Sequence, residues 1–329
     1  MHSCSYGGIL EMIEGGEIMP LETRHVTILL CTYNGAAFLS QQLASYLDQT
    51  HKNWSLWISD DGSSDATLEI LEQFKMDHGD HHEVRILQGP CKGRAGLNFM
   101  TLLCNPELPD GLVALSDQDD IWLPEKLARA LEMIPPQASA PVLYSAQSYH
   151  IDRDGNRYGQ SRVPAQVPVF ETAMLQNVLA GHAMVLDEAA RDLVQRAGIP
   201  EDVVFHDWWL TLLLTGAGAQ IVLDDHRVLL YRRHGVNVLG PPGGLRANWN
   251  RVRRLAGREY RQWVMANSMG LQAVPVVLQA RNVEILDCFV GSPSHSGPAR
   301  VALLRRLNLH RQSKAETLLL YVLAFLGRL

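Results

Sequence analysis

The sequence predicts an α/β protein with a mostly parallel central sheet, helices on both faces and a C-terminal helical extension. From His25 onward, short β-branched or aliphatic runs alternate with amphipathic stretches, which is typical of repeated strand–helix units. Past the cluster Pro241-Pro242-Gly243-Gly244, the sequence turns helical and rich in arginine. The chain has 329 residues, of which 47% are apolar, so it is long enough to bury a large core.

The predicted sheet begins with four strands, each followed by a helix. These strands are expected at Val26–Cys31, Trp54–Ser59, Val84–Gln88 and Leu112–Ser116, and their helices at Phe38–Leu47, Ala66–Lys75, Gly96–Leu103 and Glu125–Ile134. Later strands are expected at Val142–Tyr149, His182–Leu186, Gln220–Leu223 and Val228–Arg232, and helices at Thr172–Leu179, Glu188–Arg196 and His206–Leu214. In such sheets ligands bind beyond the carboxyl ends of the strands, so the loops there are where a site is expected.

Charge divides the chain into segments. Residues 1–245 hold 16 basic and 31 acidic side chains, whereas residues 246–329 hold 13 basic and 4 acidic ones, and the overall net charge is −6. We therefore predict a flexible tail over residues 1–24, an acidic α/β domain over 25–245 and a basic helical extension over 246–329. The negative net charge gives no reason to expect a nucleic-acid partner.

Cysteine usage and hydropathy bear on the compartment. The five cysteines are odd in number and form no C-x-x-C pair, which favours a reducing cytoplasm over a disulfide framework or a zinc site. Residues 1–22 have no basic segment followed by an unbroken apolar run, so they are not predicted to be a signal peptide. The longest apolar run, Thr317–Leu326, is about half of what a membrane span needs.

Two loops of the predicted sheet are acidic. After the second strand, Asp60 and Asp61 precede a glycine and two serines; they are able to contact a nucleotide, but the loop by itself favours a turn that starts a helix. After the fourth strand, Asp117, Asp119 and Asp120 lie within four residues, where they repel one another unless a counter-ion is present. Oxygen ligands without a nearby cysteine favour Mg²⁺ or Mn²⁺ over an acidic surface turn.

Two later segments carry groups able to move protons or bind phosphate. In His206-Asp207-Trp208-Trp209, Asp207 is a candidate general base, although a helix-capping aspartate beside core tryptophans explains the string equally well. Further on, Tyr231-Arg232-Arg233-His234 places two arginines and a histidine after a strand, where they are able to face a diphosphate or a metal. The alternative is a solvated basic strand end.

The order of these strings carries a resemblance. C-T-Y-N-G, D-D-G-S-S-D, S-D-Q-D-D-I-W, G-H-A-M, H-D-W-W and Y-R-R-H-G-V-N follow one another from about His25 to Gly240. In this order they resemble the family-2 glycosyltransferases of GT-A fold, a Rossmann-like α/β architecture, and most of all the bacterial rhamnosyltransferase-like branch that builds surface polysaccharides such as O-antigen.

The resemblance implies a role for each matching residue. The nucleotide-sugar donor would contact Thr32, Tyr33, Asn34, Asp60, Asp61, Asp117 and Arg233. The divalent cation would be held by Asp119 as first choice, with Asp117 and His234 and with Asp120 in support. Asp207 would be the general base, and the acceptor would lie near Gly181, His182, His206 and Trp208. The reaction implied is metal-dependent, inverting transfer, with L-rhamnose from dTDP-L-rhamnose as the best guess.

The basic extension leaves several partners open. Five arginines between 251 and 261 and five basic residues between 300 and 314 come before the apolar run Leu318–Leu326. Basic residues beside a short apolar helix are typical of a segment that lies on an anionic membrane, here the inner face of the plasma membrane, which would suit a glycan or polyprenyl-linked acceptor. The alternatives are a cap packed on the α/β domain and a homodimer interface.

Other function classes would need other features. A nucleotidyltransferase would want a glycine-rich, basic phosphate loop after the first strand, which Thr32-Tyr33-Asn34-Gly35 does not provide. A non-catalytic nucleotide- or carbohydrate-binding module would need neither Asp119 nor Asp207, and a metal-dependent hydrolase remains open.

Overall fold

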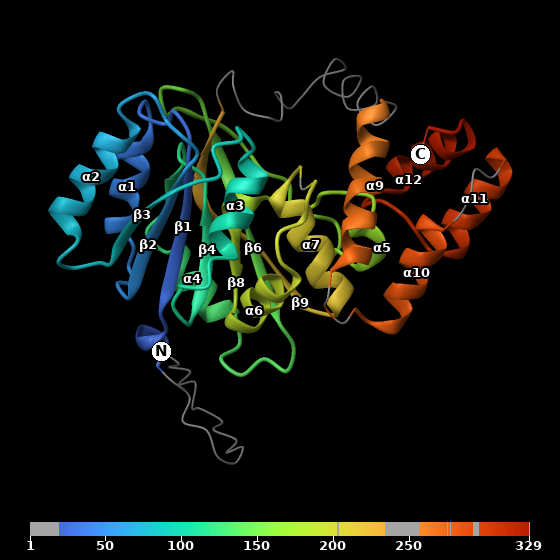
Figure 1. Cartoon of the computed structure of the whole chain (residues 1–329), viewed down its shortest axis with the longest axis horizontal. Helices are drawn as coiled ribbons and strands as arrows, with labels where there is room; N and C mark the ends of the chain where they lie inside the picture. Colours follow the sequence, from blue (N-terminus) through green and yellow to red (C-terminus); the bar gives the residue numbers. More distant parts are fainter. Residues whose placement is uncertain are drawn as a thin grey trace, which may run out of the picture.

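A nine-stranded sheet organises the part of the chain that the structure, a computed structural model, describes, namely residues 20–202, 204–233, 257–274, 276, 278–291 and 296–328 (Figure 1). The strands are β1 (Val26–Thr32), β2 (Trp54–Asp60), β3 (Val84–Gln88), β4 (Leu112–Ser116), β5 (Ile121–Trp122), β6 (Val142–Ile151), β7 (Arg157–Gln160), β8 (Met184–Leu186) and β9 (Gln220–Arg232). The helices of the α/β part are α1 (Leu39–Leu47), α2 (Thr67–His78), α3 (Ala95–Leu103), α4 (Lys126–Met133), α5 (Phe170–Ala173), α6 (Glu188–Ala197) and α7 (His206–Ala217).

The strand order is β3-β2-β1-β4-β8-β6-β9-β5, and β7 pairs with β6 at the side. Neighbours among β3, β2, β1 and β4 are parallel, as are β6 and β9. The short strand β8 runs antiparallel to both β4 and β6, and β5 runs antiparallel to β9. The predicted α/β class is confirmed, with antiparallel strands joining its two parallel parts.

Two apolar layers cover the sheet, one on each face. Alternate residues of β1 point to opposite sides: Ile28 and Leu30 enter the layer beneath α1, α2 and α4, whereas Leu29 and Cys31 enter the layer beneath α3, α6 and α7. Figure 1 shows α1 and α2 on one side of the strands and α7 on the other. Because the four parallel strands all end at one edge, the loops that follow them meet there.

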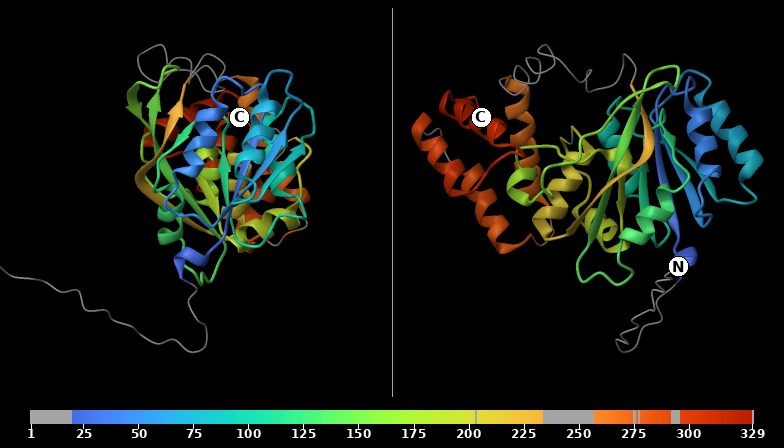
Figure 2. Two further views of the ribbon diagram at one scale, coloured as in Figure 1. Left: turned by 90° about the vertical axis from the view of Figure 1, so that its left-hand side faces the viewer. Right: turned by 180° about the vertical axis from the view of Figure 1, so that it is seen from behind.

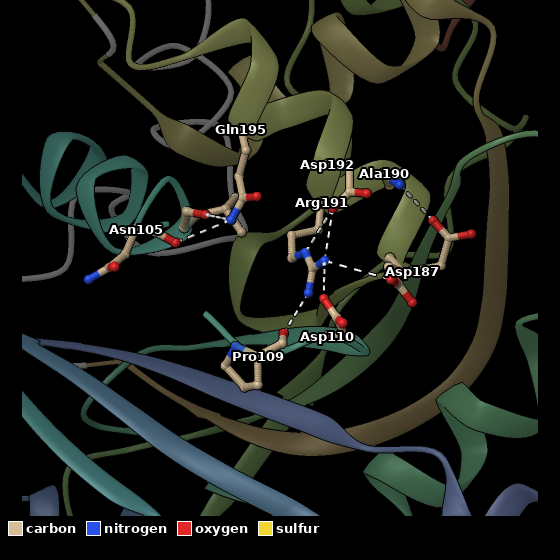
Figure 3. Close-up of polar contacts among 10 residues, drawn as sticks. Asn105, Pro109, Asp110, Asp187, Ala190, Arg191, Asp192 and Gln195 are labelled. Atoms are coloured by element: carbon tan, nitrogen blue, oxygen red, sulfur yellow. Dashed lines mark hydrogen bonds and ion pairs between the residues drawn. The ribbon is translucent and has the colours of Figure 1, made fainter. Parts of the chain in front are cut away.

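Helix α6 fastens the connection that leads into β4 (Figure 3). Arg191, only 4% exposed, donates from Nη1 to the Pro109 carbonyl and lies 3.4 Å from Asp110. Gln195 donates to the carbonyl of Asn105, and Asp187 caps the helix by accepting from the Ala190 amide at 2.8 Å. These bonds hold the start of β4, the strand that delivers the acidic loop.

The helix predicted at Thr172–Leu179 is much shorter, because α5 ends at Ala173. The Trp208 indole donates to the Ala173 carbonyl at 2.6 Å, and the Tyr260 hydroxyl donates to the Leu175 carbonyl at 2.6 Å. Carbonyls that accept from distant side chains no longer need helical partners, so the helix stops.

Two strand predictions also change. The strands expected at 220–223 and 228–232 are one continuous strand, β9, because the polar residue Asp224 points inward, where it pairs with Arg129 at 2.7 Å and accepts from the Tyr144 hydroxyl. The strand expected from His182 begins later, since residues Gly181–Ala183 form the 3₁₀ turn η2 before β8. A local sequence pattern predicts neither the ion pair of Asp224 with Arg129 nor the 3₁₀ turn.

The C-terminal helices α9 (Arg258–Ala273), α10 (Ala280–Val290), α11 (Gly297–Arg306) and α12 (Lys314–Phe325) form a layer beyond α7 (Figure 1, Figure 2). Tyr260, Ile285 and Leu320 belong to the same apolar layer as Trp209 of α7, so these helices cap the α/β part. The predicted boundary at 245–246 lies outside the described residues. None of the described helices has the length and apolar character to cross a membrane.

Residues 20–24, placed in the predicted flexible tail, are held to the fold. Residues Leu21–Thr23 form the 3₁₀ turn η1, and Arg24 donates from Nη1 to the carbonyls of Leu131 and Ile134. The last residues of the predicted tail are therefore packed on the α/β part.

Candidate active site

The acidic loop after β4 meets a histidine from the 3₁₀ turn η2 that precedes β8. Nδ1 of His182 lies 3.7 Å from Oδ2 of Asp117 and 4.0 Å from Oδ2 of Asp120. The three ligand-type atoms all lie within 4.8 Å of one another. We call Asp117, Asp120 and His182 the Asp-Asp-His cluster.

Asp120 is the most deeply placed member of the cluster, with 0% exposure. Its Oδ1 accepts from the Arg232 amide at 3.0 Å, whereas its Oδ2 is buried without a hydrogen bond from the described residues. Burial, and then the charges of Asp119 and Asp117, raise the pKa of Asp120 well above its usual range. A buried carboxylate oxygen with no donor is the kind of atom that a cation would satisfy.

The pKa of Asp117 is shifted in the opposite direction to that of Asp120. Burial pushes its pKa up, but the contact with His182 and the electrostatic interactions with His182, His206 and Lys126 outweigh burial, so the net shift is downward. Asp117 is therefore the member that stays ionised, and Asp120 is the one that a cation would have to ionise.

A lysine lies buried beneath the cluster. Lys126, 0% exposed, donates from Nζ to the His182 carbonyl at 2.6 Å, and its Nζ lies 3.6 Å from the centre of the Trp122 ring. Burial lowers the pKa of Lys126 to about 7 against the opposing pull of Asp120 and Asp117. It thus holds the 3₁₀ turn that presents the His182 imidazole and places a positive charge near both carboxylates.

The cluster fits a divalent cation by chemistry, since two carboxylates and one imidazole suit Mn²⁺, and hard oxygen ligands suit Mg²⁺. The membership differs from the sequence prediction. Asp119, the predicted first ligand, is not among the three, and its carbonyl accepts from Nε of Arg232 at 3.0 Å. Asp120, expected only in support, is the one that joins the cluster, because the two-residue strand β5 pairs with β9 directly after it and draws Asp120 inward; cation binding by Asp119 stays a prediction. His234 lies outside the described residues.

The turn after β1 is saturated with hydrogen bonds. The amides of four consecutive residues all donate to side chains: Tyr33 to Gln118 Oε1, Asn34 to Ser63 Oγ, Gly35 to Thr67 Oγ1 and Ala36 to Asp65 Oδ2. A phosphate-binding loop needs such amides free. This turn is therefore not one in the present conformation, which counts against the nucleotidyltransferase alternative.

The five residues predicted to line the nucleotide pocket after β1 and β2 divide into two groups. Thr32, 1% exposed, donates to Oδ2 of Asp60, and Asp60 also accepts from the Gly62 and Ser63 amides. Thr32 and Asp60 thus shape the turn, as the alternative interpretation had it, and their contact with the donor stays a prediction.

Of the other three predicted pocket residues, Tyr33 and Asn34 are exposed, whereas Asp61 is buried, at 5% exposure. The Tyr33 ring is 52% exposed. Asn34, in the left-handed region at φ 48°, accepts with Oδ1 from the Ser64 amide. Oδ1 of Asp61 accepts from the Lys92 amide at 3.2 Å, which leaves its second oxygen for a base.

Asp207 lies in the first turn of α7, next to His206, whose ring lies against Gly181, the neighbour of His182. Its Oδ1 accepts from the Trp208 amide at 2.8 Å, and its Oδ2 accepts no hydrogen bond from the described part of the chain. His206 links it to the cluster: burial lowers the pKa of His206, while Asp207 and Asp117 both act on it to raise the pKa. His206 therefore stays neutral between two carboxylates, and Asp207 offers one oxygen to a proton donor.

The His206 ring is held from two sides. It stacks on Phe99 with ring centres 4.0 Å apart, and its buried Nε2, which has no hydrogen-bond partner among the described residues, lies against Gly181. A β-carbon at Gly181 would overlap that nitrogen. Gly181 thus serves to admit His206, and its predicted acceptor contact stays a prediction.

Gly181→Ala should therefore lower the free energy of unfolding by about 1–3 kcal/mol, because the stacked imidazole has no room to move aside. Urea unfolding followed by tryptophan fluorescence measures this. Gly159→Ala is the matched control, since a β-carbon there meets only His150 Nδ1 at an ordinary 3.6 Å. Equal midpoints for both variants would show that His206 adapts freely.

Two further predicted contacts have different outcomes. Trp208 is 3% exposed and donates its indole N–H to the Ala173 carbonyl, so it packs inside the protein, and the expectation that it touches the acceptor is not supported. Arg233 directly follows β9 and is half-buried. Burial is the main cause that lowers the pKa of His150, and the charge of Arg233 lowers it further. A small polar cavity opens beside His182, lined among others by Ser145, Gln147 and Ser161.

Sequence reasoning missed three residues that build the site. Lys126 stands at the start of a predicted helix, where a lysine is ordinarily exposed to solvent. Gln118 lies between two aspartates, and only the aspartates have the chemistry of metal ligands. Arg232 was noted only as one of a basic pair, yet it is 1% exposed and contacts Gln41 and the carbonyls of Asp119 and Arg153. Of the three, only Lys126 could have been found from the sequence: it follows Trp122 by four residues, a spacing that allows the lysine to contact the indole ring.

Comparison with known proteins distinguishes between the function classes considered above. The sequence profile described as "Glycosyl transferase family 2" matches residues 27–189, a range that includes β1 to β8 and the Asp-Asp-His cluster. The chain belongs to glycosyl transferase family 2. It is thus a glycosyltransferase that uses a nucleotide-sugar donor.

Relatives of this family-2 glycosyltransferase include bacterial enzymes that transfer different sugars. It is 27% identical to the dTDP-rhamnosyl transferase RfbG of Shigella flexneri over 73% of this chain and 84% of the relative. It is 26% identical to WfaP of Escherichia coli, a UDP-Glc:alpha-D-GlcNAc-diphosphoundecaprenol beta-1,3-glucosyltransferase, over 59% and 72% of the two chains.

Solved structures confirm the GT-A fold predicted for this family-2 glycosyltransferase. S. aureus TarS 1–349 in complex with UDP-GlcNAc gives a TM-score of 0.56 at 13% identity, over 81% of this chain and 70% of that one. The mannosyltransferase PcManGT of Pyrobaculum calidifontis, in complex with GDP-Man and Mn²⁺, gives 0.52 at 15% identity, over 93% and 88%.

Proposed function

We propose that this enzyme is an inverting, metal-dependent transferase that moves L-rhamnose from dTDP-L-rhamnose to a hydroxyl of a lipid-linked oligosaccharide or growing surface polysaccharide. The observation that carries it is the approach of two functional groups at one edge of the sheet. The Asp-Asp-His cluster is suited to the diphosphate end of a donor, and Asp207, linked to it through His206, is suited to the acceptor hydroxyl.

Each group of the chain has a role in this reaction. Asp207 accepts the proton of the acceptor hydroxyl through its free Oδ2, while its Oδ1 stays on the Trp208 amide. The acceptor oxygen then bonds to the anomeric carbon as the bond from that carbon to the diphosphate breaks, which inverts the configuration. Asp117, Asp120 and His182 would hold the cation, which supplies positive charge for the leaving diphosphate.

The donor nucleotide would extend along the loops after β1 and β2. The exposed Tyr33 ring offers a face for the base, and Asp61 offers one carboxylate oxygen to an imide N–H. Asn34 borders the same surface, and Arg233 at the opposite rim offers its guanidinium to the phosphates. The polar cavity beside His182 would receive part of the acceptor.

The choice of rhamnose depends on the relative from Shigella flexneri, and the relative from Escherichia coli favours glucose instead. A thermal-shift panel decides between them: dTDP-rhamnose, UDP-glucose, UDP-GlcNAc and GDP-mannose, each with MnCl₂ and with EDTA. A donor at about 100 times its Kd should stabilise the fold by about 2.7 kcal/mol, which is several degrees in unfolding midpoint.

The pattern of shifts tests the parts of this proposal separately. A Mn²⁺-dependent shift confined to dTDP-rhamnose supports rhamnosyl transfer, and one confined to UDP- or GDP-sugars overturns that assignment while keeping a transferase. The absence of any shift across the panel would contradict the donor site itself. Release of nucleoside diphosphate that depends on an added acceptor separates a transferase from a binding module or a hydrolase.

A further inference from the structure

The last helix of the C-terminal layer, α12, exposes an apolar face. Every exposed position from residue 315 to 326 is apolar. The large exposed side chains there are Leu318 (64%), Val322 (47%), Phe325 (55%) and Leu326 (61%). Their spacing of four, three and one residues places them on one side of α12, which continues one residue past its end. We call these four residues the apolar face of α12.

The opposite side of the same helix packs against the rest of the protein. Leu320, Leu323 and Ala324 are at most 4% exposed and belong to the apolar layer shared with α7. The helix is therefore docked by one side and does not need its outer leucines for the fold. Contiguous apolar side chains left in water on a docked helix mark an interaction surface.

Positive charge borders this face. Residues 296–328 contain six basic side chains and one acidic side chain, Glu316, whose carboxylate lies 3.5 Å from Nε of Arg311. Arg311 is itself buried, at 9% exposure, so it is not part of the basic surface predicted from the sequence. Its pairing with Glu316 leaves the outer surface of α11 and α12 basic.

Three arginines approach α12 directly. The guanidinium of Arg305 lies over the Tyr321 ring at 5.4 Å, Nη1 of Arg300 lies 3.5 Å from the Ala324 carbonyl, and Nη1 of Arg261 lies 3.4 Å from the Gly327 carbonyl. Arg306 and Lys314 are exposed at the facing ends of the two helices. The apolar face is thus bordered by cations from α9, α11 and α12.

We propose that the apolar face of α12 is a docking surface for an anionic phospholipid bilayer, with its apolar side chains at the boundary of headgroups and acyl chains and the arginines on the phosphates. Figure 1 and Figure 2 show α11 and α12 at the end of the molecule away from α1 and α2. The helix would lie on the surface, since no described helix can span it.

Charge decides between a bilayer and a second copy of this chain. In a two-fold dimer the same patch meets itself, so Arg300, Arg305 and Arg306 of one copy would face those of the other. The two helices offer no unpaired carboxylate to separate them, because Glu316 already pairs with Arg311. An anionic surface supplies the missing negative charge.

The test is flotation of the full chain with vesicles of phosphatidylcholine and phosphatidylglycerol, and with phosphatidylcholine alone. The wild type should float with the anionic vesicles and not with the neutral ones. Leu318→Ser with Phe325→Ser should reduce the bound fraction by about tenfold or more. Arg305→Glu with Arg306→Glu should do so as well, and both variants should keep the wild-type unfolding midpoint, since all four side chains are exposed.

The matched control removes exposed apolar side chains elsewhere. Leu68→Ser with Met76→Ser alters α2, where the two side chains are 40% and 69% exposed, and should float like the wild type. Failure of the wild type to bind anionic vesicles, or equal flotation of all variants, overturns the proposal. A wild-type dimer that Leu318→Ser with Phe325→Ser dissociates, without lipid binding, would assign the face to a second copy instead.

Discussion

Replacing Asp207 by Asn should reduce sugar transfer by about 10²- to 10⁴-fold, the usual contribution of a positioned general base. An amide keeps the Oδ1 that accepts from the Trp208 amide, so the start of α7 stays intact. It loses only the ability to take the acceptor proton. The measurement is the initial rate of nucleoside diphosphate release with a saturating acceptor.

Two companion measurements separate a lost base from a damaged site. The thermal shift given by donor and Mn²⁺ should be the same in Asp207→Asn and in the wild type, because Asp207 does not hold the donor in the proposed arrangement. Asp225→Asn, an exposed carboxylate on β9, is the matched control and should keep full activity. If Asp207→Asn retains more than about a tenth of the wild-type rate, Asp207 is not the base.

The first half of the sheet was predictable because its signals are local. β3 and β4 begin and end at the predicted residues, and β1 and β2 extend one residue further. β1, β2 and β4 are buried along their whole length, and β3, at the edge of the sheet, keeps an aliphatic centre between exposed residues. The pattern needs no information from elsewhere in the chain.

The errors come from partners that are distant in sequence. Helix α5 stops because Trp208 and Tyr260, 35 and 85 residues away from their acceptors, take the carbonyls of Ala173 and Leu175. Asp224 looks like a turn residue until Arg129 and Tyr144 are placed beside it. A tertiary contact overrides the local preference in both cases, and no window along the sequence contains it.

The candidate site shows the same division. Spacing alone indicated a cation at the acidic loop, since like charges crowded in one loop need a counter-charge, whereas the choice of Asp207 as base needed the family resemblance. Spacing could not choose between Asp119 and Asp120, because that choice depends on the pairing of β5 with β9, more than a hundred residues apart. Nor could it join His182 to the loop, a contact made by the order of β4 and β8 in the sheet.

Asp120→Asn should abolish the stabilisation that Mn²⁺ gives and reduce transfer by about 100-fold or more. The variant keeps an oxygen for the Arg232 amide, so the loop retains its anchor. Burial raises the pKa of Asp120, so above about pH 4 the folded state disfavours its charged form relative to the unfolded chain. In EDTA at neutral pH the unfolding midpoint of the variant should therefore equal or exceed that of the wild type, and only the metal response should be lost.

Asp119→Asn, made beside it, decides between the sequence-based ligand set and the one that the fold brings together. If the cluster holds the cation, the Mn²⁺ titration of the unfolding midpoint should be lost in Asp120→Asn and largely kept in Asp119→Asn, because Asp119 is not among the three converging side chains. The reverse result would return the first ligand to Asp119. It would also mean that the loop rearranges when the donor and the cation bind, since Oδ2 of Asp120 is buried in the conformation described.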